Sequence, residues 1–306
     1  MKRVVALLVI TAMSAMLFAC GSQDAVSTTE YVTADSSATA SIPGVNAADY
    51  VTPYADIDFS GGEITEQKGV ISLEIKNGSV DKSVYIEELP VKFLGREEKL
   101  PVLCIKSTDA WVKGVFSEFE NNLEFYAFVA EKGGFSVEVF YLDNSTTAAN
   151  RGIVCATESI GGDAKRSGWG IAENVSGAPY FITGHSAENE YSSVYASAVS
   201  DDEFVHVVGV YNGETKRNAI YVNGTLVSSD SAAGAFTSAN KTEVYENFNM
   251  ANAFFIGADP AGSSGKADKC DFPSNDLMVL DVKFYACALT DANVKAAFAQ
   301  SAKIFG

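Results

Sequence analysis

The sequence predicts an all-β domain of antiparallel sheets over most of its 306 residues. From about Tyr50 to the end, short apolar or alternating runs follow one another. Clusters of Gly, Asn, Asp and Ser separate these runs, and only one segment has the spacing of an amphipathic helix. Many short strands with turn signals between them are typical of a sandwich or a barrel, and about 250 residues can form one such domain.

The candidate strands are short, and turn-forming residues separate them. In chain order they cover residues 70–75, 102–106, 123–130, 135–142, 151–156, 168–173, 179–184, 204–211, 218–224, 253–258 and 277–286.

The run 204–211 has the clearest alternation, and the residues on both of its faces are largely apolar. We therefore predict an interior strand, with the core on one side and a loop or a second sheet on the other. Further along the chain, Asn223 and Gly224 supply the pair of positive φ angles that a tight reversal requires.

One helix is predicted, directly after the last strand. Thr290 is a favourable N-cap residue, and Val294, Ala297 and Phe298 share one face of the segment that follows. We expect this short C-terminal helix to pack on an end of the domain.

The first twenty residues predict an export signal. Lys2 and Arg3 precede an uncharged apolar stretch that is shorter than a membrane-spanning helix requires. The stretch ends in Leu-Phe-Ala-Cys, which resembles a bacterial lipobox and implies that Cys20 is lipidated. That resemblance implies a lipoprotein anchored in the membrane at the bacterial cell surface or envelope, and an ordinary secretory signal is the alternative.

A disordered tether is predicted over residues 21–49, which contain neither Lys nor Arg and are rich in Ser, Thr and Ala. Such a composition cannot bury enough apolar surface to offset the entropy of ordering the chain. The predicted organisation is a lipoprotein signal peptide over 1–20, the tether over 21–49 and one domain over 50–306.

The net charge argues against nucleic acid as a partner. The chain has 22 Lys and Arg against 39 Asp and Glu, a net charge of −17. Removal of the signal peptide leaves 20 basic residues against 39 acidic ones, a net charge of −19. A surface this acidic repels phosphate backbones.

Four cysteines follow Cys20, namely Cys104, Cys155, Cys270 and Cys287. No pair has the close spacing of a zinc knuckle or of a redox CxxC motif. Export permits two disulfides with three connectivities, but three of the four cysteines lie in apolar runs, where a cysteine behaves as a small buried hydrophobe. Disulfides and buried thiols are therefore both open.

The order of several motifs resembles the LamG-like, concanavalin A-like lectin/glucanase family. In chain order the motifs are FSVEVFY, GIVCATE, GGDAKRSGWGIAE, PYFITG, FVHVVGVYNG, IYVNGTLV, FFIGADP and LDVKFYACALTDANV. The resemblance covers about residues 55–300 and is strongest after Phe135. It implies a jelly roll, which is a sandwich of two antiparallel sheets, and binding of glycans or proteins through loops at one end or through the concave face.

Three conspicuous residues are interpreted as structural. Gly209 and Gly257 lie where a strand must bend or another backbone approaches closely. His206 occupies a position often filled by His in this family, and a lone His on an apolar strand is more often a structural group than a catalytic one.

No arrangement of acidic residues predicts a glycosidase. Retaining glycosidases place two carboxylates about 5–5.5 Å apart, and the E-x-D-x-x-E or E-x-D-x-E run of laminarinase-like relatives does not occur here. Asp56 and Asp58 share a face, but a glycine turn follows before Glu63, whereas Glu138 and Asp143 lie on opposite faces. We predict that the protein is not an enzyme, with a divergent glycosidase as the least favoured alternative.

Two segments, 180–195 and 245–252, carry aromatic rings that can stack on sugars, with amides and carboxylates that can bind hydroxyl groups. The candidate ligand-binding residues are Tyr180, His185, Glu188, Asn189, Tyr191, Tyr195, Tyr245, Asn247 and Phe248. The alternative interpretation places Tyr180 in the core and the other aromatic residues over sheet edges.

A calcium site is a second hypothesis, and it rests on the resemblance. In calcium-binding relatives an Asp on the final strand meets groups from the first strand, and Asp281 and Asp58 match these places. An Asp within an apolar strand needs a partner, whether an ion, a Lys or a backbone N–H. If the partner is an ion, calcium is the expected cofactor, because it accepts a loose shell of six to eight oxygens.

The leading functional hypothesis is a surface-anchored, non-enzymatic module that binds extracellular carbohydrate. The export signal, the tether and the family resemblance motivate it. The alternative is an envelope lipoprotein that binds protein partners or has a structural role.

Overall fold

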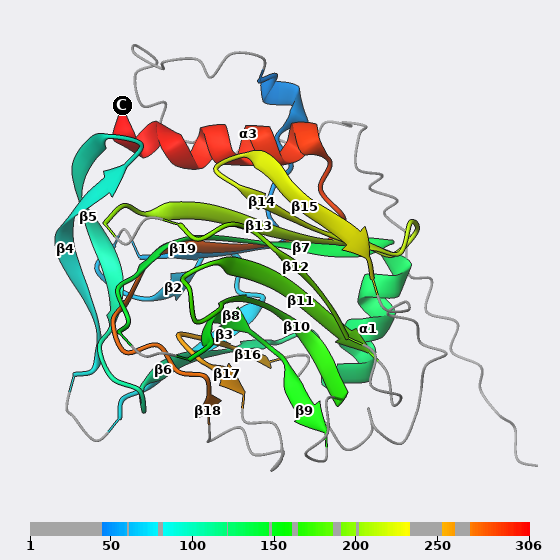
Figure 1. Cartoon of the computed structure of the whole chain (residues 1–306), viewed down its shortest axis with the longest axis horizontal. Coiled ribbons are helices and arrows are strands. Elements are labelled where there is room, and N and C mark those ends of the chain that lie inside the picture. The colour runs from blue at the N-terminus through cyan, green and yellow to red at the C-terminus, as the bar shows by residue number, and fades with distance from the viewer. Residues whose placement is uncertain are drawn as a thin grey trace, which may run out of the picture. The chain divides into compact units, whose positions relative to one another are not determined.

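A computed structural model describes residues 45–59, 61–78, 82–120, 122–146, 149–160, 165–185, 191–199, 202–232, 253–260 and 270–306. The strands of these residues form two antiparallel sheets that stack face to face in a jelly-roll sandwich (Figure 1). This arrangement confirms the fold class predicted from the sequence.

The first sheet, sheet A, has nine strands among the described residues, in the order β15-β14-β13-β7-β19-β1-β2, with β5 paired to β19 and β4 paired to β5. Its strands are β1 (Ala55–Asp58), β2 (Thr65–Glu66), β4 (Val84–Phe93), β5 (Arg96–Ile105), β7 (Gly134–Asp143), β13 (Val205–Asn212), β14 (Arg217–Val222), β15 (Thr225–Ser231) and β19 (Leu277–Tyr285). Strand β13 lies between β7 and β14, which confirms the interior strand predicted at 204–211.

The second sheet, sheet B, has eight strands among the described residues, in the order β12-β11-β10-β8-β16-β6-β3, with β9 paired to β10. Its strands are β3 (Ile71–Lys76), β6 (Trp111–Phe116), β8 (Arg151–Cys155), β9 (Glu158–Ile160), β10 (Lys165–Glu173), β11 (Pro179–His185), β12 (Tyr191–Tyr195) and β16 (Ala253–Ile256). The remaining elements are the β17 (Asp259–Pro260) and β18 (Cys270–Asp271) pair, the helices α1 (Asn122–Glu131) and α3 (Asp291–Ala302), and the 3-10 helices η1 (Ala47–Asp49) and η2 (Lys303–Phe305).

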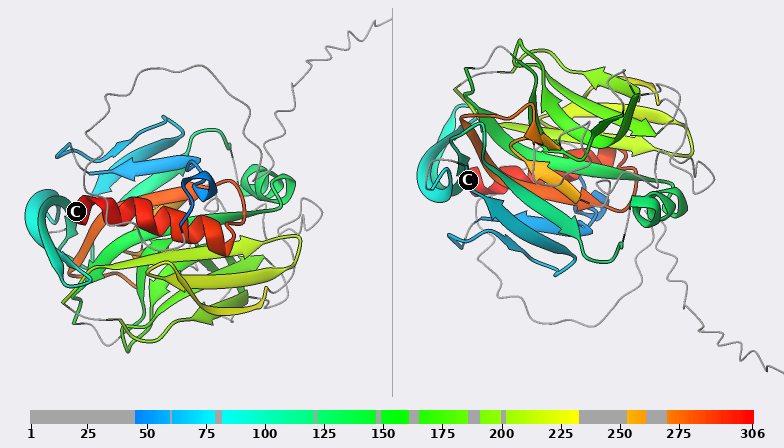
Figure 2. Two further views of the ribbon diagram at one scale, coloured as in Figure 1. Left: turned by 90° about the horizontal axis from the view of Figure 1, so that it is seen from above. Right: turned by 90° about the horizontal axis from the view of Figure 1, so that it is seen from below.

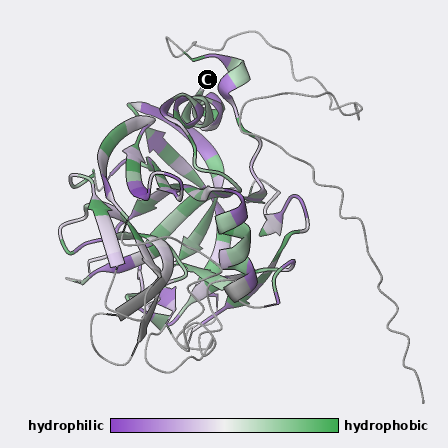
Figure 3. Ribbon diagram, turned by 90° about the vertical axis from the view of Figure 1, so that its right-hand side faces the viewer, coloured by the Kyte–Doolittle hydropathy of each residue, from purple (hydrophilic) through white to green (hydrophobic). Residues whose placement is uncertain are grey.

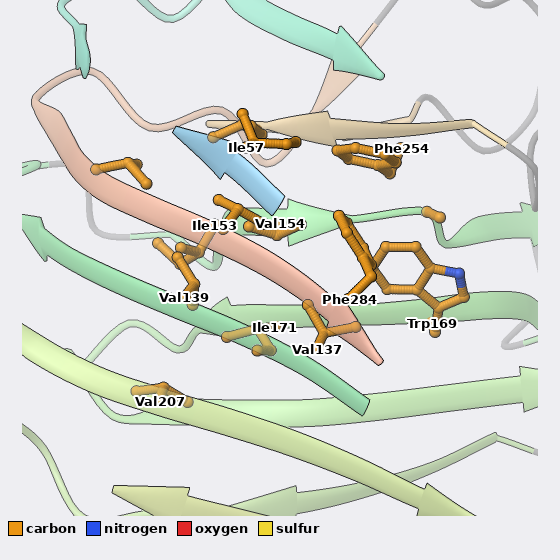
Figure 4. Close-up of a cluster of buried hydrophobic side chains, with 14 of the residues drawn as sticks. Ile57, Val137, Val139, Ile153, Val154, Trp169, Ile171, Val207, Phe254 and Phe284 are labelled. Atoms are coloured by element: carbon orange, nitrogen blue, oxygen red, sulfur yellow. The ribbon is translucent and has the colours of Figure 1, made fainter. Parts of the chain in front are cut away.

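The main core lies between the two sheets, because every second residue of a strand points inward. Hydrophobic residues run along the strands of the sandwich (Figure 3). Figure 4 labels ten members of the core, Ile57, Val137, Val139, Ile153, Val154, Trp169, Ile171, Val207, Phe254 and Phe284.

Two glycines permit close packing at the places where the sequence predicts it. A Cβ atom on Gly209 would lie 2.2 Å from the ring of Phe181. Gly257 has a φ of 88°, and a Cβ there would lie 2.5 Å from Ile105. The close approach at both glycines comes from a side chain rather than from another backbone.

Helix α3 covers the outer face of sheet A (Figure 2). The predicted cap is present, since the hydroxyl of Thr290 accepts from the backbone N–H of Asn293. Val294 and Ala297 pack against Val208 and other outward-facing residues of the sheet. The helix therefore lies across the sheet and not on the end of the domain, because the outward face of β13 is apolar and needs a cover. This cover is a helix and not the loop or second sheet predicted for the outer face of 204–211.

The run 123–130, predicted as a strand, forms most of helix α1, so this prediction is wrong. Phe125, Tyr126 and Val129 are buried, and their spacing fits one side of a helix. The segment is rich in the helix formers Ala, Leu and Glu and has a single β-branched residue. Gly133, with a φ of 71°, follows the helix.

The cysteines favour the buried-thiol alternative. The Sγ atoms of Cys104 and Cys155 are buried and lie 3.7 and 3.2 Å from backbone carbonyl oxygens. Burial raises the pKa of the Cys104 thiol to about 11. Cys270 and Cys287 are half-buried, and Cys287 packs with the residues under α3.

The predicted signal peptide and Cys20 lie outside the described residues. Within the described ranges, no helix has both the length and the apolar character to cross a membrane. Near the start of these ranges, the carbonyl of Asp49 accepts a hydrogen bond from the side chain of Asn293 at 2.8 Å. The chain is therefore already packed against α3 at η1.

Candidate functional site

Three tyrosines of the predicted binding segment share the outer face of β11 and β12, the face of sheet B that points away from the core. Tyr180 and Tyr195 are register partners, and their ring centroids lie 5.1 Å apart. Tyr191 is paired with Gly184 and points to the same face as Tyr195, four residues further on. Tyr195 and Tyr191 are 51% and 42% exposed, whereas Tyr180 is buried. The buried ring of Tyr180 therefore packs against the exposed ring of Tyr195 and supports it.

The opposite face of β12 fixes this edge strand to the sandwich. Val194 belongs to the main core. The buried side chain of Asn218 donates to the hydroxyls of Ser192 at 2.9 Å and Thr183 at 2.7 Å. On the outer face, between the two exposed tyrosines, the buried hydroxyl of Ser193 has no hydrogen-bond partner among the described residues. The strand thus presents its tyrosines from a rigid support.

The remaining predicted rim residues are not placed by the structure. Glu188, Asn189, Tyr245, Asn247 and Phe248 lie outside the described residues. His185 is the last residue of β11, where its backbone is in register with Ser167 of β10.

The strand ends that flank the two predicted segments nevertheless lie at one end of sheet B. Strand β11 ends there at His185, and β12 begins there at Tyr191. Strand β16 begins at Ala253, two residues before Phe255, which pairs with Cys155 at the end of β8. Cys155 in turn pairs with Gly170 in the middle of β10. Three strand spacings, about 14 Å, separate β11 from β16. The described strand ends next to the two predicted segments therefore lie at the same end of one sheet.

Strand β17 covers the middle of the outer face of sheet B. A Cβ atom on Gly152 of β8 would lie 2.3 Å from the carbonyl carbon of Ala258, so only a glycine permits this crossing. The buried carboxylate of Asp259 then accepts from the backbone N–H of Thr157 at 3.2 Å and from its hydroxyl. Sequence reasoning missed this cover, although the FFIGADP motif contains it. At the β12 edge of this face, Tyr191 and Tyr195 are exposed.

The two predicted calcium ligands are neighbours in sheet A. Asp58 and Asp281 are register partners between β1 and β19. The ammonium of Lys283 donates to Asp281 at 2.5 Å, and a lysine was one of the partners that the sequence left open. Burial raises the pKa of Asp281, and Lys283 opposes this rise. Within the described ranges, no group of three or more His, Cys, Asp or Glu is placed to hold a metal ion, and calcium stays a prediction.

Glu138 of β7 is the centre of a buried polar network under α3. Lys283 Nζ lies 3.2 Å and His206 Nε2 lies 3.1 Å from its carboxylate. The hydroxyls of Tyr285 and Ser301 donate to it at 2.5 and 2.8 Å. Burial alone raises a carboxyl pKa, but Lys283 and His206 hold the pKa of Glu138 below its usual range. The network attaches α3 to sheet A, which is a structural role for His206, as predicted.

A second buried ionic cluster joins the two sheets near the end of β7. The guanidinium of Arg151 donates to Asp143 at 2.5 Å and to Glu173 at 2.8 Å. The hydroxyl of Tyr141 donates to Glu173 at 2.8 Å. Burial, followed by the charge of Asp143, raises the pKa of Glu173 to about 7. Because Arg151 binds both buried carboxylates, the geometry favours an inter-sheet connection over a catalytic pair.

A small cavity next to α1 is too small for a sugar. Its volume is about 10 Å³, and aromatic side chains, including Phe116, Phe125 and Phe128, form most of its lining. A space of this size holds at most one water molecule. The exposed tyrosine edge of sheet B, which we call the tyrosine face (Tyr180, Tyr191, Ser193 and Tyr195), is therefore the candidate site.

Solved structures of toxin binding domains share this fold. The binding domain of botulinum neurotoxin DC in complex with SialylT is 13% identical, with a TM-score of 0.54 over 81% of this chain and 51% of that chain. The binding domain of botulinum neurotoxin DC in complex with rat synaptotagmin II is 13% identical, with a TM-score of 0.53 over 81% of this chain and 51% of that chain. The receptor binding domain of botulinum neurotoxin type G is 11% identical, with a TM-score of 0.51 over 82% of this chain and 52% of that chain. The chain thus spans about half the length of these structures, and the likeness concerns the fold.

Sequence comparison identifies the family. No curated protein matches this chain significantly. The model of the Concanavalin A-like lectin/glucanases superfamily matches residues 120–295, which is more than half of the 306 residues. This matched region contains most of both sheets as well as the tyrosine face. The chain therefore belongs to the concanavalin A-like lectin/glucanase superfamily.

Proposed function

We propose that this chain is a non-enzymatic module that binds extracellular carbohydrate through the tyrosine face. The observation that carries the proposal is the pair of exposed rings, Tyr191 and Tyr195, on an edge strand that is held from its inner side. A tyrosine offers an apolar face and a hydroxyl group, and both are suited to a ligand that is apolar on one side and polar at its rim.

The acidic residues support a binding role over catalysis. A retaining glycosidase needs two carboxylates that face the substrate at short distance. In the described residues, Asp143 and Glu173 are buried around Arg151. Glu138 is buried and Asp281 is half-buried beside Lys283. Strand β17 also crosses the face of sheet B on which a long substrate groove would run.

The comparisons give further support. One similar structure is a binding domain in complex with SialylT. Another belongs to botulinum neurotoxin type C, whose cell entry is dependent upon interaction with two ganglioside molecules. These ligands belong to those proteins. They indicate that the fold is compatible with glycan binding.

The proposal is tested on the full chain with a glycan array and with polysaccharide pull-downs, each with added calcium and with a chelator. We expect glycan binding that falls about tenfold in Tyr191→Ala and in Tyr195→Ala, since each loses one stacking ring. Ile75→Ala is the matched control, because Ile75 is similarly exposed, at 45%, on β3 at the opposite edge of sheet B. Absence of binding to every glycan under both conditions would contradict the proposal. A loss of binding on chelation alone would support the predicted calcium.

The proposed location is the bacterial envelope, through a lipid on Cys20. The apolar leader and the lipobox-like sequence before Cys20 support it. Labelling of the bacterial host with a fatty acid analogue should mark the wild-type chain and leave Cys20→Ala unmarked. Equal release of both chains into the soluble fraction would contradict the anchor.

A protein partner is the second candidate function. Leu226 and Val227 are exposed on β15, and this edge strand of sheet A packs against β12. Neighbouring edge strands with apolar side chains are suited to an extended protein segment. A pull-down that recovers one stoichiometric protein, and loses it in Leu226→Asp, while no sugar binds, would favour this function over the first.

A further inference from the structure

The spacing of the exposed tyrosines limits the shape of a ligand. Tyr191 and Tyr195 are four residues apart on one straight strand, which places their Cα atoms about 13 Å apart. A single sugar ring cannot contact two aromatic rings at this distance. A ligand that uses both tyrosines must therefore be several sugars long and must follow the direction of β12.

The two rings also have different supports, which makes them separate contact positions. Tyr195 stacks on the buried ring of Tyr180 at 5.1 Å, which limits its motion. Tyr191 faces Gly184 across the strand pair, and Gly184 contributes no side chain. Between them lies the buried Ser193 hydroxyl, which lacks a hydrogen-bond partner among the described residues. An unsatisfied buried hydroxyl costs free energy, but this oxygen is closed to solvent and is therefore not a contact for the ligand.

The local charge limits the chemistry of the ligand. Strands β11 and β12, which carry the tyrosine face, contain no Lys or Arg. Recognition of a carboxylate or a sulfate depends on Arg or Lys, because these side chains form the charge-assisted hydrogen bonds. The preceding cations in the chain, Lys165 and Arg166, begin β10, which is separated from β12 by β11. An anionic sugar would therefore find no cationic partner on these two strands.

We infer that the tyrosine face takes a neutral, linear oligosaccharide that lies along β12, with one sugar on Tyr195, another on Tyr191 and the intervening part over Ser193. This inference rests on the proposed carbohydrate-binding function and narrows its ligand class. It differs from the sialylated and ganglioside ligands named for the similar structures.

The test measures affinity against ligand length and ligand charge on the full chain. The ligands are neutral glucose, mannose and xylose oligosaccharides, together with sialylated and sulfated oligosaccharides, each from monosaccharide to hexasaccharide. We expect the affinity for neutral ligands to rise at least about tenfold once a ligand is long enough to reach both tyrosines. Tyr191→Ala and Tyr195→Ala should each abolish this rise in affinity with ligand length. Each variant should keep the affinity of the wild type for the shortest ligands, because these still bind the one tyrosine ring that remains.

The possible outcomes separate the inference from the proposed function. Equal affinity for monosaccharides and hexasaccharides would overturn the two-position geometry, and a preference for sialylated or sulfated ligands would overturn the charge argument. Either result leaves carbohydrate binding intact. Binding of no ligand in the set, with Ile75→Ala and the wild type showing the same thermal midpoint, would overturn the proposed function and the inference with it.

Discussion

Two hairpin turns of sheet A have nearly the same backbone and very different sequences. Asn223 and Gly224 join β14 to β15 with φ angles of 48° and 75°. Leu94 and Gly95 join β4 to β5 with φ angles of 48° and 74°. Asn tolerates the left-handed region, whereas Leu pays about 1–2 kcal/mol there. The first turn is therefore encoded locally, and the second is imposed by the strands that it joins.

The surroundings of the two turns explain how each conformation is kept. The side chain of Asn223 accepts from the backbone N–H of His206 at 3.0 Å, and Gly224 packs on the ring of Phe298. Leu94 is 58% exposed, and no described atom lies within 4 Å of a Cβ built on Gly95. Apart from the backbone N–H of Gly95, which donates to the carboxylate of Glu203 at 3.3 Å, the support of the β4–β5 turn comes mainly from the ten-residue strands on each side.

The largest effect is expected for Gly224→Ala. An alanine there must adopt a φ of 75°, and its Cβ would lie 2.8 Å from the ring of Phe298. That ring is packed between Phe93 and His206. Strain and overpacking together should lower the free energy of unfolding by about 3 kcal/mol. Urea unfolding followed by tryptophan fluorescence measures the change. If the loss does not shrink in a Phe298→Leu background, the steric part of the explanation is wrong.

Asn223→Leu gives the β14–β15 turn the residue type found in the other turn. The variant loses the acceptor for the N–H of His206 and places a branched side chain at a φ of 48°. We expect a loss of about 2 kcal/mol in the free energy of unfolding. Asn223→Asp is the control, because it keeps an acceptor and tolerates the left-handed region. Equal losses in both variants would contradict the local encoding of this turn.

Gly95→Ala measures the free-energy cost of the left-handed backbone without a steric contact of the added Cβ. Its φ of 74° matches that of Gly224, but the space for a Cβ is open among the described atoms. The expected loss is about 1 kcal/mol, and the difference from Gly224→Ala measures the contact with Phe298. Urea midpoints of the two variants, recorded under one condition, give this difference. A loss at Gly95 as large as that at Gly224 would show that the packing against the helix contributes nothing.

The same contrast explains which parts of the fold are predictable from the sequence. Strands β13 and β14 are predicted because their alternation is clean and an Asn-Gly pair follows β14. Strand β4 is not predicted, because Leu-Gly is no local turn signal and residues 84–101 carry many charges on an exposed hairpin. Helix α1 is predicted as a strand because eight apolar-rich residues fit either period, and only the tertiary contacts of Phe125 and Val129 decide.

The candidate site divides in the same way. The tyrosines of β12 are visible in the sequence, because residue type alone marks them. The pairing of Tyr180 with Tyr195 depends on strand register, and the contact of Lys283 with Glu138 joins residues 145 positions apart. Spacing in the chain carries no signal for such contacts. The crossing of β17 over sheet B likewise depends on the tertiary structure. In the sequence it is marked only by a glycine at position 152, where the crossing strand leaves no space for a side chain.

Leu94→Asn is expected to have an effect no larger than that of Gly95→Ala, and it is the sharpest test because it should stabilise the protein. Asn relieves the left-handed strain at a φ of 48° and removes an exposed apolar side chain, so the free energy of unfolding should rise by about 1 kcal/mol. The urea midpoint should increase with an unchanged slope. A decrease would mean that the Leu94 side chain makes contacts worth more than the strain. In that case side-chain contacts would hold both turns, and the turns would differ only in the groups that their side chains contact.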